Sequence, residues 1–142
     1  GIGMEVIAQD IFHVPGIEEQ IGMKYVELDE LLERADFISL HTPSLNGVKL
    51  ISKENIDKMK DGVVFINTSR GDNVNEDDLL EALNSGKIRA AGLDVYADEP
   101  ATNAALYSHT NVSCTPHIGA ATKEAQQRIG VEIVDIIENF GK

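Results

Sequence analysis

Short apolar runs alternate along the chain with segments in which apolar residues recur at helical spacing. Runs of this kind, bounded by polar turns, are typical of β-strands. Strands are predicted at residues 4–8, 24–28, 37–41, 63–67, 88–95 and 112–115. The run Val63–Asn67 is the clearest, because an unbroken apolar stretch is typical of a strand buried on both faces of a parallel sheet.

Four helices are predicted between and after these strands, at residues 29–34, 52–59, 76–84 and 121–140. Ser52 and Asn75 stand where a side-chain oxygen can cap the first turn, and Gly86 can end a helix. The last helix is amphipathic, with one apolar stripe formed by Ile129, Ile133, Ile136 and Ile137. Strands that alternate with helices predict βαβ units, and therefore an α/β fold with a doubly wound parallel sheet.

Composition narrows the classes of partner. The formal net charge is −12 at pH 7, whereas a nucleic-acid-binding surface must be basic. No apolar run approaches the about 20 residues that cross a bilayer, and residues 1–10 carry no signal-peptide pattern. The one cysteine, Cys114, excludes an internal disulfide and is expected to be a buried packing residue. The histidines are too scattered for a metal site. We therefore expect a cytoplasmic protein that binds neither nucleic acid nor membrane.

Polar or ionisable residues follow five of the predicted strands. In open α/β sheets, ligands bind outside the carboxyl ends of the strands. One charged strand end is unremarkable, but five in succession at one edge predict a lined crevice. The residues at these strand ends are Asp10, His41, Thr42, Thr68, Ser69, Arg70, Asp94, Glu99 and His117.

Asp10 fits the acidic residue that accepts hydrogen bonds from the adenosine ribose of NAD, and its charge disfavours the extra phosphate of NADP. A solvated aspartate at a strand end is the alternative. The glycine-rich loop that should precede such a residue by about 20 positions is not in the sequence. Gly1-Ile2-Gly3 is not that loop, because it runs straight into a predicted strand and begins no helix.

Three residue types together match the oxidation of a 2-hydroxy acid, which needs a hydride acceptor, a base for the hydroxyl proton and a cation for the carboxylate. Arg70 offers a planar fork that can hold a carboxylate, although a pair with Asp72 is the alternative. His117 can exchange a proton near neutral pH, although a lone histidine is more often structural. A carboxylate such as Glu99 beside the imidazole would favour its protonated form and hold one tautomer. The combination predicts that Arg70, Glu99 and His117 are catalytic.

Three segments of the sequence resemble the signatures of the D-isomer-specific 2-hydroxyacid dehydrogenases. They are Asn67-Thr68-Ser69-Arg70-Gly71, Ala91-Gly92-Leu93-Asp94-Val95-Tyr96 with Asp98-Glu99-Pro100, and Thr115-Pro116-His117-Ile118-Gly119. The resemblance covers essentially the whole chain and implies a Rossmann NAD-binding domain. Within the family, residues 99–103 and 117–126 are similar to phosphoglycerate dehydrogenases, which implies D-3-phosphoglycerate as substrate and a role in serine biosynthesis.

Carried over by position, the resemblance implies a role for each site residue. Arg70 would bind the substrate carboxylate, His117 would be the general acid/base, and Glu99 would be its partner. Asp94 would hold the nicotinamide carboxamide, and Asp10 the adenosine ribose. The lining of the NAD site would be completed by Thr42, Thr68, Ser69, Arg70, His117, Ile118, Gly119 and Ala120.

The resemblance also implies that residues 1–142 are a partial NAD-binding domain, without its first strand, its glycine-rich loop or the substrate domain. Without the central first strand, residues 4–8 and 37–41 become unpaired edges, and such edges invite pairing with another chain. We therefore expect a homo-oligomer or association through the exposed sheet edge, and low stability and activity for the segment alone. Two alternatives remain open: a binding module like the NAD-sensing corepressors of this fold, and a non-catalytic association module.

Overall fold

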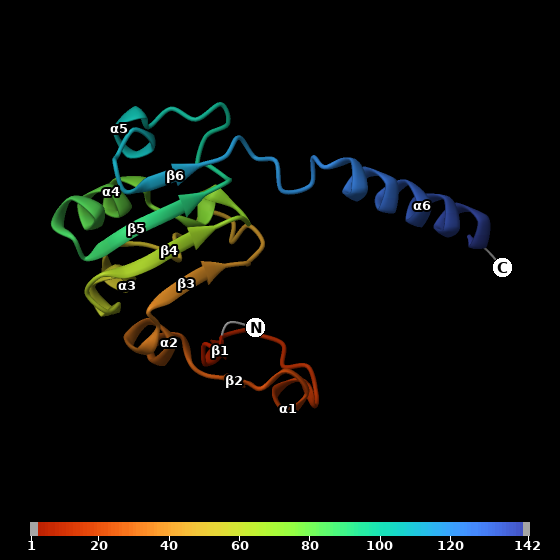
Figure 1. Ribbon diagram of the computed structural model, residues 1–142, viewed down its shortest axis with the longest axis horizontal. Helices are drawn as coiled ribbons and strands as arrows, with labels where there is room; N and C mark the ends of the chain where they lie inside the picture. Colours follow the sequence, from red (N-terminus) through yellow and green to blue (C-terminus); the bar gives the residue numbers. More distant parts are fainter. Residues whose placement is uncertain (1–2, 141–142) are drawn as a thin grey trace.

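Four parallel strands form the central sheet of the molecule (Figure 1). The computed structural model describes residues 3–140. In spatial order the strands are β3 (Phe37–Leu40), β4 (Val63–Asn67), β5 (Ile88–Leu93) and β6 (Val112–Cys114). Each connection between successive strands passes through a helix, as parallel pairing requires. The predicted α/β class is confirmed.

One face of this sheet carries the main hydrophobic core. The helices that pack there are α2 (Leu28–Arg34), α3 (Lys53–Lys58), α4 (Glu76–Ser85) and α5 (Ala104–Tyr107). Along β4, Val63 and Phe65 are buried under these helices, whereas Val64 and Ile66 on the other face are half-buried. Each fully buried side chain of this size contributes about 1.5–3 kcal/mol to folding, so this layer holds the strand ends in place.

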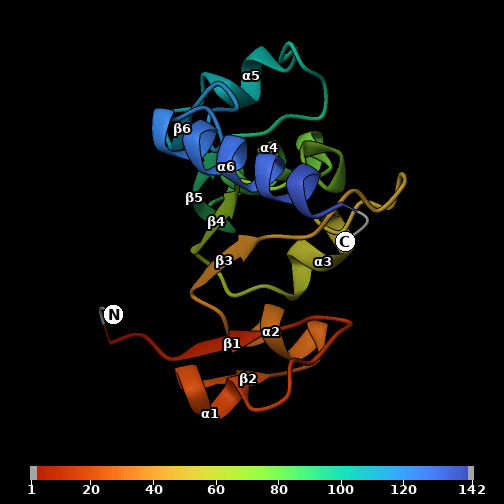
Figure 2. The same ribbon diagram turned by 90° about the vertical axis from the view of Figure 1, so that its right-hand side faces the viewer.

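A second, two-stranded parallel sheet lies beyond β3 (Figures 1 and 2). It consists of β1 (Val6–Ala8) and β2 (Met23–Tyr25), with α1 (Ile17–Ile21) between them. Within residues 3–140, β1 pairs only with β2 and β3 only with β4, so both keep an open edge. Val6 and Phe37 on these strands are 49% and 53% exposed. The predicted apolar edge at β3 is thus observed, and association through it stays a prediction.

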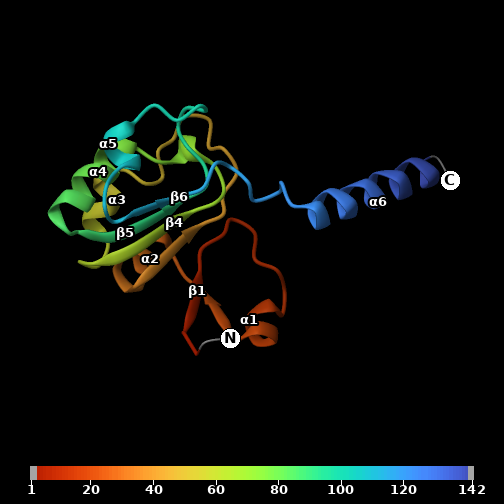
Figure 3. The same cartoon turned by 45° about the horizontal axis from the view of Figure 1, so that its top comes forward.

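The long C-terminal helix α6 (Lys123–Asn139) projects away from the sheet (Figures 1 and 3). Thr122 caps it, since its hydroxyl oxygen accepts the Ala125 N–H at 3.1 Å. The predicted helix is confirmed. Its apolar stripe is exposed, with no side chain of the helix buried against the described part of the chain. No helix within residues 3–140 is long and apolar enough to cross a membrane.

Helix capping is confirmed for α4 and wrong for α3. The Asn75 carboxamide oxygen accepts the N–H groups of Asp77 and Asp78, and Gly86 ends α4 with φ 80°. Ser52 precedes α3 but makes no capping hydrogen bond. The N–H of Lys53 is bound instead by the Asp78 carboxylate at 2.8 Å, because α4 lies beside the start of α3.

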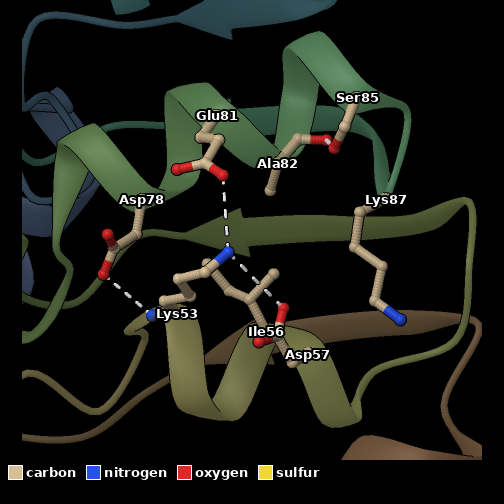
Figure 4. A pocket seen from close by; sticks show the side chains of 8 residues that line it. All are labelled: Lys53, Ile56, Asp57, Asp78, Glu81, Ala82, Ser85 and Lys87. Atoms are coloured by element: carbon tan, nitrogen blue, oxygen red, sulfur yellow. Dashed lines mark hydrogen bonds and ion pairs between the residues drawn. The ribbon is translucent and has the colours of Figure 1, made fainter.

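Figure 4 shows this contact at the rim of a small hollow of about 40 Å³ between α3 and α4. Lys53 also reaches the Glu81 carboxylate at 3.4 Å across the hollow. None of the lining residues is a predicted site residue. The hollow is therefore a packing feature of two helices joined by exposed ion pairs.

Several predicted boundaries and one burial assignment are wrong. The strand predicted at 24–28 ends at Tyr25, because Leu28 begins α2 and packs against the core. The strand predicted at 88–95 ends at Leu93, where the chain turns away through Asp94. Cys114 is exposed rather than buried, because nothing in residues 3–140 covers that side of β6.

Candidate active site

The last residues of the four strands form one row across the sheet. Leu40, Asn67, Leu93 and Cys114 are successive partners in the β3-β4-β5-β6 register. The segments that follow them therefore leave the sheet at the same edge. Because neighbouring strands lie about 4.8 Å apart, the ends of β4 and β6 are about 10 Å from each other. This edge carries all the predicted site residues except Asp10.

Glu99 and His117 face each other at this edge. The His117 Nδ1 lies 2.8 Å from both Glu99 carboxylate oxygens, and both side chains are about half exposed. The hydrogen bond from His117 lowers the pKa of Glu99 below its ordinary value. An ionised carboxylate can only accept, so Nδ1 carries the proton. The other ring nitrogen, Nε2, is left free to accept or donate a proton.

Asp94 fixes the segment that presents His117. One carboxylate oxygen accepts the Thr115 hydroxyl at 2.5 Å and the Ile118 N–H at 3.0 Å, and the other accepts the Gly119 N–H at 3.0 Å. Asp94 is only 6% exposed. The Thr115 hydroxyl is the main cause that lowers the pKa of Asp94. The contacts hold His117 in a left-handed conformation with φ 53°, which side-chain-bearing residues rarely adopt.

This arrangement adds a function to Asp94 that the sequence did not suggest. A carboxylate has about four acceptor positions, and three of those on Asp94 are used within the chain. One position is left for the carboxamide role implied by the family resemblance. Gly119 lies so close that a Cβ there would sit 3.2 Å from the Asp94 carboxylate. Asp94 is therefore first of all the anchor of the His117 segment.

We predict that Asp94→Asn lowers the free energy of unfolding by about 1–3 kcal/mol at pH 7, because at least one buried N–H or hydroxyl loses its acceptor. A carboxyl with a lowered pKa stabilises the fold above its unfolded-state pKa, near 4, and loses that contribution as pH falls through the lowered value. The difference between wild type and variant should therefore shrink below about pH 4. Urea unfolding at pH 7 and pH 3 measures it.

Asp98→Asn is the matched control for that measurement. Asp98 is exposed in the same region of the chain and, among residues 3–140, its side chain accepts only the Thr102 hydroxyl. Its replacement should change stability by less than about 0.5 kcal/mol at either pH. Equal losses in the two variants would show that Asp94 is not a structural anchor.

The loop that carries Arg70 is shaped by Asn67, a residue the sequence analysis did not single out. The buried Asn67 carboxamide accepts the N–H and hydroxyl of Ser69 and donates to the Arg70 carbonyl. The exposed Arg70 guanidinium donates to the Ser69 carbonyl at 2.7 Å. Within residues 3–140 no carboxylate lies in ion-pair range of Arg70, and Asp72 accepts the Ser44 hydroxyl instead, so the alternative pair with Asp72 is wrong. Its cationic group remains available for an anion.

Hydrogen bonds between residues distant in the sequence stabilise the loop that carries Glu99. Glu76 accepts the Tyr107 hydroxyl at 2.6 Å and the Ala97 N–H at 2.8 Å. The Tyr96 hydroxyl donates to the Thr115 carbonyl, and burial raises the pKa of Tyr96 to about 12. Burial also raises the pKa of Tyr107. Both phenols therefore remain protonated donors at physiological pH. These tyrosines and Glu76 were missed, because a hydrogen bond across 31 positions leaves no periodic signal in the sequence.

Asp10 stands apart from the other predicted site residues. It follows β1 in the two-stranded sheet, is exposed, and accepts the Phe12 N–H on one carboxylate oxygen at 2.9 Å. The structure brings Asp94, Glu99 and His117 together but does not bring Asp10 to them. Gly1 and Ile2 of the rejected glycine motif lie outside the described residues.

The residues at these strand ends fit an extended dinucleotide. The exposed Asp10 carboxylate has an oxygen available for ribose hydroxyls, and Thr68 is an exposed residue. Ile118 exposes an apolar side chain beside His117, suited to the face of an aromatic ring. No group of His, Cys, Asp and Glu within residues 3–140 could hold a metal ion.

Comparison with known proteins identifies the family of this chain. Residues 1–119 match the family described as D-isomer specific 2-hydroxyacid dehydrogenase, NAD binding domain. The chain is 47% identical over 139 residues to the hydroxypyruvate reductase of Thermotoga maritima, covering 95% of this chain and 44% of the relative. It is 44% identical over 136 residues to the D-3-phosphoglycerate dehydrogenase of Mycobacterium leprae, covering 95% and 26%. The chain thus spans less than half the length of these relatives.

Solved structures resemble the whole described fold. The apo D-mandelate dehydrogenase of Rhodotorula graminis matches with a TM-score of 0.93 and 32% identity, over 99% of this chain and 41% of that one. The D-lactate dehydrogenase of Aquifex aeolicus, solved with NAD and lactic acid, matches with a TM-score of 0.82 and 35% identity, over 97% and 46%. The chain therefore belongs to the D-isomer specific 2-hydroxyacid dehydrogenase family, matches its NAD-binding domain, and has NAD as its cofactor.

Proposed function

We propose that the whole protein interconverts a D-2-hydroxy acid and its 2-keto acid with NAD as the hydride carrier. The observation that carries the proposal is the 2.8 Å contact between Glu99 and the His117 imidazole. It lies at the sheet edge from which Arg70 also emerges, with no carboxylate of residues 3–140 paired to that guanidinium. A base and a free cation at one edge are what this reaction needs from the protein.

In the oxidative direction, Nε2 of His117 accepts the proton of the substrate hydroxyl. The C2–H and O–H bonds break and a C=O bond forms, while bound NAD supplies the acceptor for the hydride. Glu99 stabilises the resulting imidazolium, because its lowered pKa keeps it ionised. In the reductive direction the same imidazolium donates its proton to the carbonyl oxygen. Arg70 binds the adjacent carboxylate and thereby orients C2.

For the substrate we propose D-3-phosphoglycerate, which would place the protein in serine biosynthesis. The similarity of residues 99–103 and 117–126 to phosphoglycerate dehydrogenases supports it, as does the relative from Mycobacterium leprae. The slightly more similar relative from Thermotoga maritima is a hydroxypyruvate reductase. Both relatives have three-carbon acids in their names, so the group on C3 is the feature to test.

A substrate panel on the whole protein tests both levels of the proposal. With NADH, we expect the highest kcat/KM for phosphohydroxypyruvate over hydroxypyruvate, glyoxylate and pyruvate. The hydroxy acid formed should have the D configuration. A higher kcat/KM for hydroxypyruvate would reject phosphoglycerate as the substrate and keep the enzyme class. NADH binding without turnover of any 2-keto acid would contradict the enzymatic proposal itself.

A further inference from the structure

A fully buried asparagine joins two loops at the edge of the sheet. Asn73 ends the short 3-10 turn Gly71–Asn73 and has no solvent-exposed surface. Its side-chain amide donates to the Thr42 hydroxyl oxygen at 2.9 Å and to the Pro43 carbonyl at 2.7 Å. Its side-chain oxygen accepts the Leu45 N–H at 3.0 Å. One carboxamide thus holds three successive parts of the loop that follows β3.

The far end of the same loop has separate main-chain anchors. The Ile51 N–H donates to the Asn73 carbonyl at 3.0 Å, and the Asn75 N–H donates to the Ile51 carbonyl at 2.8 Å. These bonds do not involve the Asn73 side chain, and Ile51 is buried in the core. Removal of the carboxamide should therefore leave the domain folded and loosen mainly residues 42–45, which are half-buried or exposed.

The direction of the hydrogen bond to Thr42 limits what that hydroxyl can do. Because the Asn73 amide donates to the Thr42 oxygen, the hydroxyl hydrogen of Thr42 points elsewhere. Within residues 3–140, no acceptor for that hydrogen is found. Asn73 thus holds the Thr42 oxygen in place at the sheet edge, and the Thr42 hydroxyl hydrogen can be donated to a ligand. The proposed NAD site lies at this edge.

We propose that Asn73 is a positioning residue for NAD binding, which orients the Thr42 hydroxyl as a donor to the bound cofactor and ties it to the Arg70 loop. This inference rests on the proposed NAD site. It assigns to Asn73 a function that is separate from stability. The carboxamide acts through Thr42 and does not itself touch the cofactor.

The test is NADH affinity, measured by fluorescence titration of the whole protein. Asn73→Ala should raise the Kd about tenfold, since one oriented hydrogen bond and the order of the loop are lost. Asn75→Ala is the matched control: Asn75 lies two positions away, its side chain caps α4, and its main-chain bond to Ile51 is kept in the variant. It should lower the urea midpoint but change the Kd less than twofold.

A double-mutant cycle separates positioning from general loosening. Thr42→Val should raise the Kd about as much as Asn73→Ala, Thr42→Ser should retain most of the affinity, and the double variant should bind no more weakly than Asn73→Ala. An unchanged Kd in Asn73→Ala, additive effects of the two replacements, or an equal Kd change in Asn75→Ala would overturn the inference. Absence of NADH binding by wild type would overturn it together with the NAD site. Absence of turnover alone would count only against the enzymatic proposal.

Discussion

Replacement of His117 by asparagine should lower kcat by about 10²–10⁴-fold, because the imidazole assigned to exchange the substrate proton is removed. Asparagine is the sharper replacement than alanine, since asparagine, like histidine, tolerates the left-handed backbone found at φ 53°. The Asp94 contacts to Ile118 and Gly119 use main-chain N–H groups and should persist. Single-turnover measurements with NADH would isolate the chemical step.

His109→Asn is the matched control for this replacement. His109 is half-buried before β6, and its Nδ1 accepts the Asn111 N–H at 3.1 Å. Turnover by this variant should stay within about twofold of wild type, since surface replacements away from the site have small effects. NADH affinity of His117→Asn should change much less than kcat. Turnover of His117→Asn near the wild-type rate would reject His117 as the acid/base.

The parts of the fold that could be predicted from the sequence have signals within a few residues. The bounds predicted for β4 from its apolar run are correct, and Asn75 and Gly86 correctly indicated the two ends of α4. The short helices α1 and α5 were not predicted, because four or five residues are too few to show helical periodicity. Ser52 failed as a cap because Asp78, distant in sequence, supplies the acceptor.

The site was predictable as a set of residues and not as a network. Glu99 and His117 lie 18 positions apart, and their contact was expected from the chemistry that the pair performs. The supports of the site have no such chemical signature. Asn67, Asn73 and Thr115 are polar residues whose partners are set by strand register and loop packing. Their functions become visible only once the strand ends are aligned in one row.

Replacement of Arg70 by alanine should lower kcat/KM by about 10²–10⁴-fold, mainly through a higher KM for the acid. A bidentate contact comprises two charge-assisted hydrogen bonds, each of about 1.5–3 kcal/mol, and each 1.36 kcal/mol corresponds to a factor of ten. Arg70→Lys should recover only part of the loss, because an ammonium group has no planar fork. NADH affinity should change less than threefold, since the guanidinium is assigned to the substrate. Steady-state kinetics measure kcat/KM, and fluorescence titration measures the Kd for NADH.

An uncharged substrate analogue makes this prediction specific to the carboxylate. If the Arg70 guanidinium binds that group, wild type should use the 2-keto amide about as poorly as Arg70→Ala uses the acid. With the amide as substrate, Arg70→Ala should then lower kcat/KM little below the wild-type value. Arg89→Ala is the matched control, because Arg89 is an exposed guanidinium near the opposite end of the sheet, bonded to the Gly62 carbonyl at 3.4 Å. A loss in Arg70→Ala that is equally large for acid and amide would mean that the arginine stabilises the loop and does not bind the carboxylate.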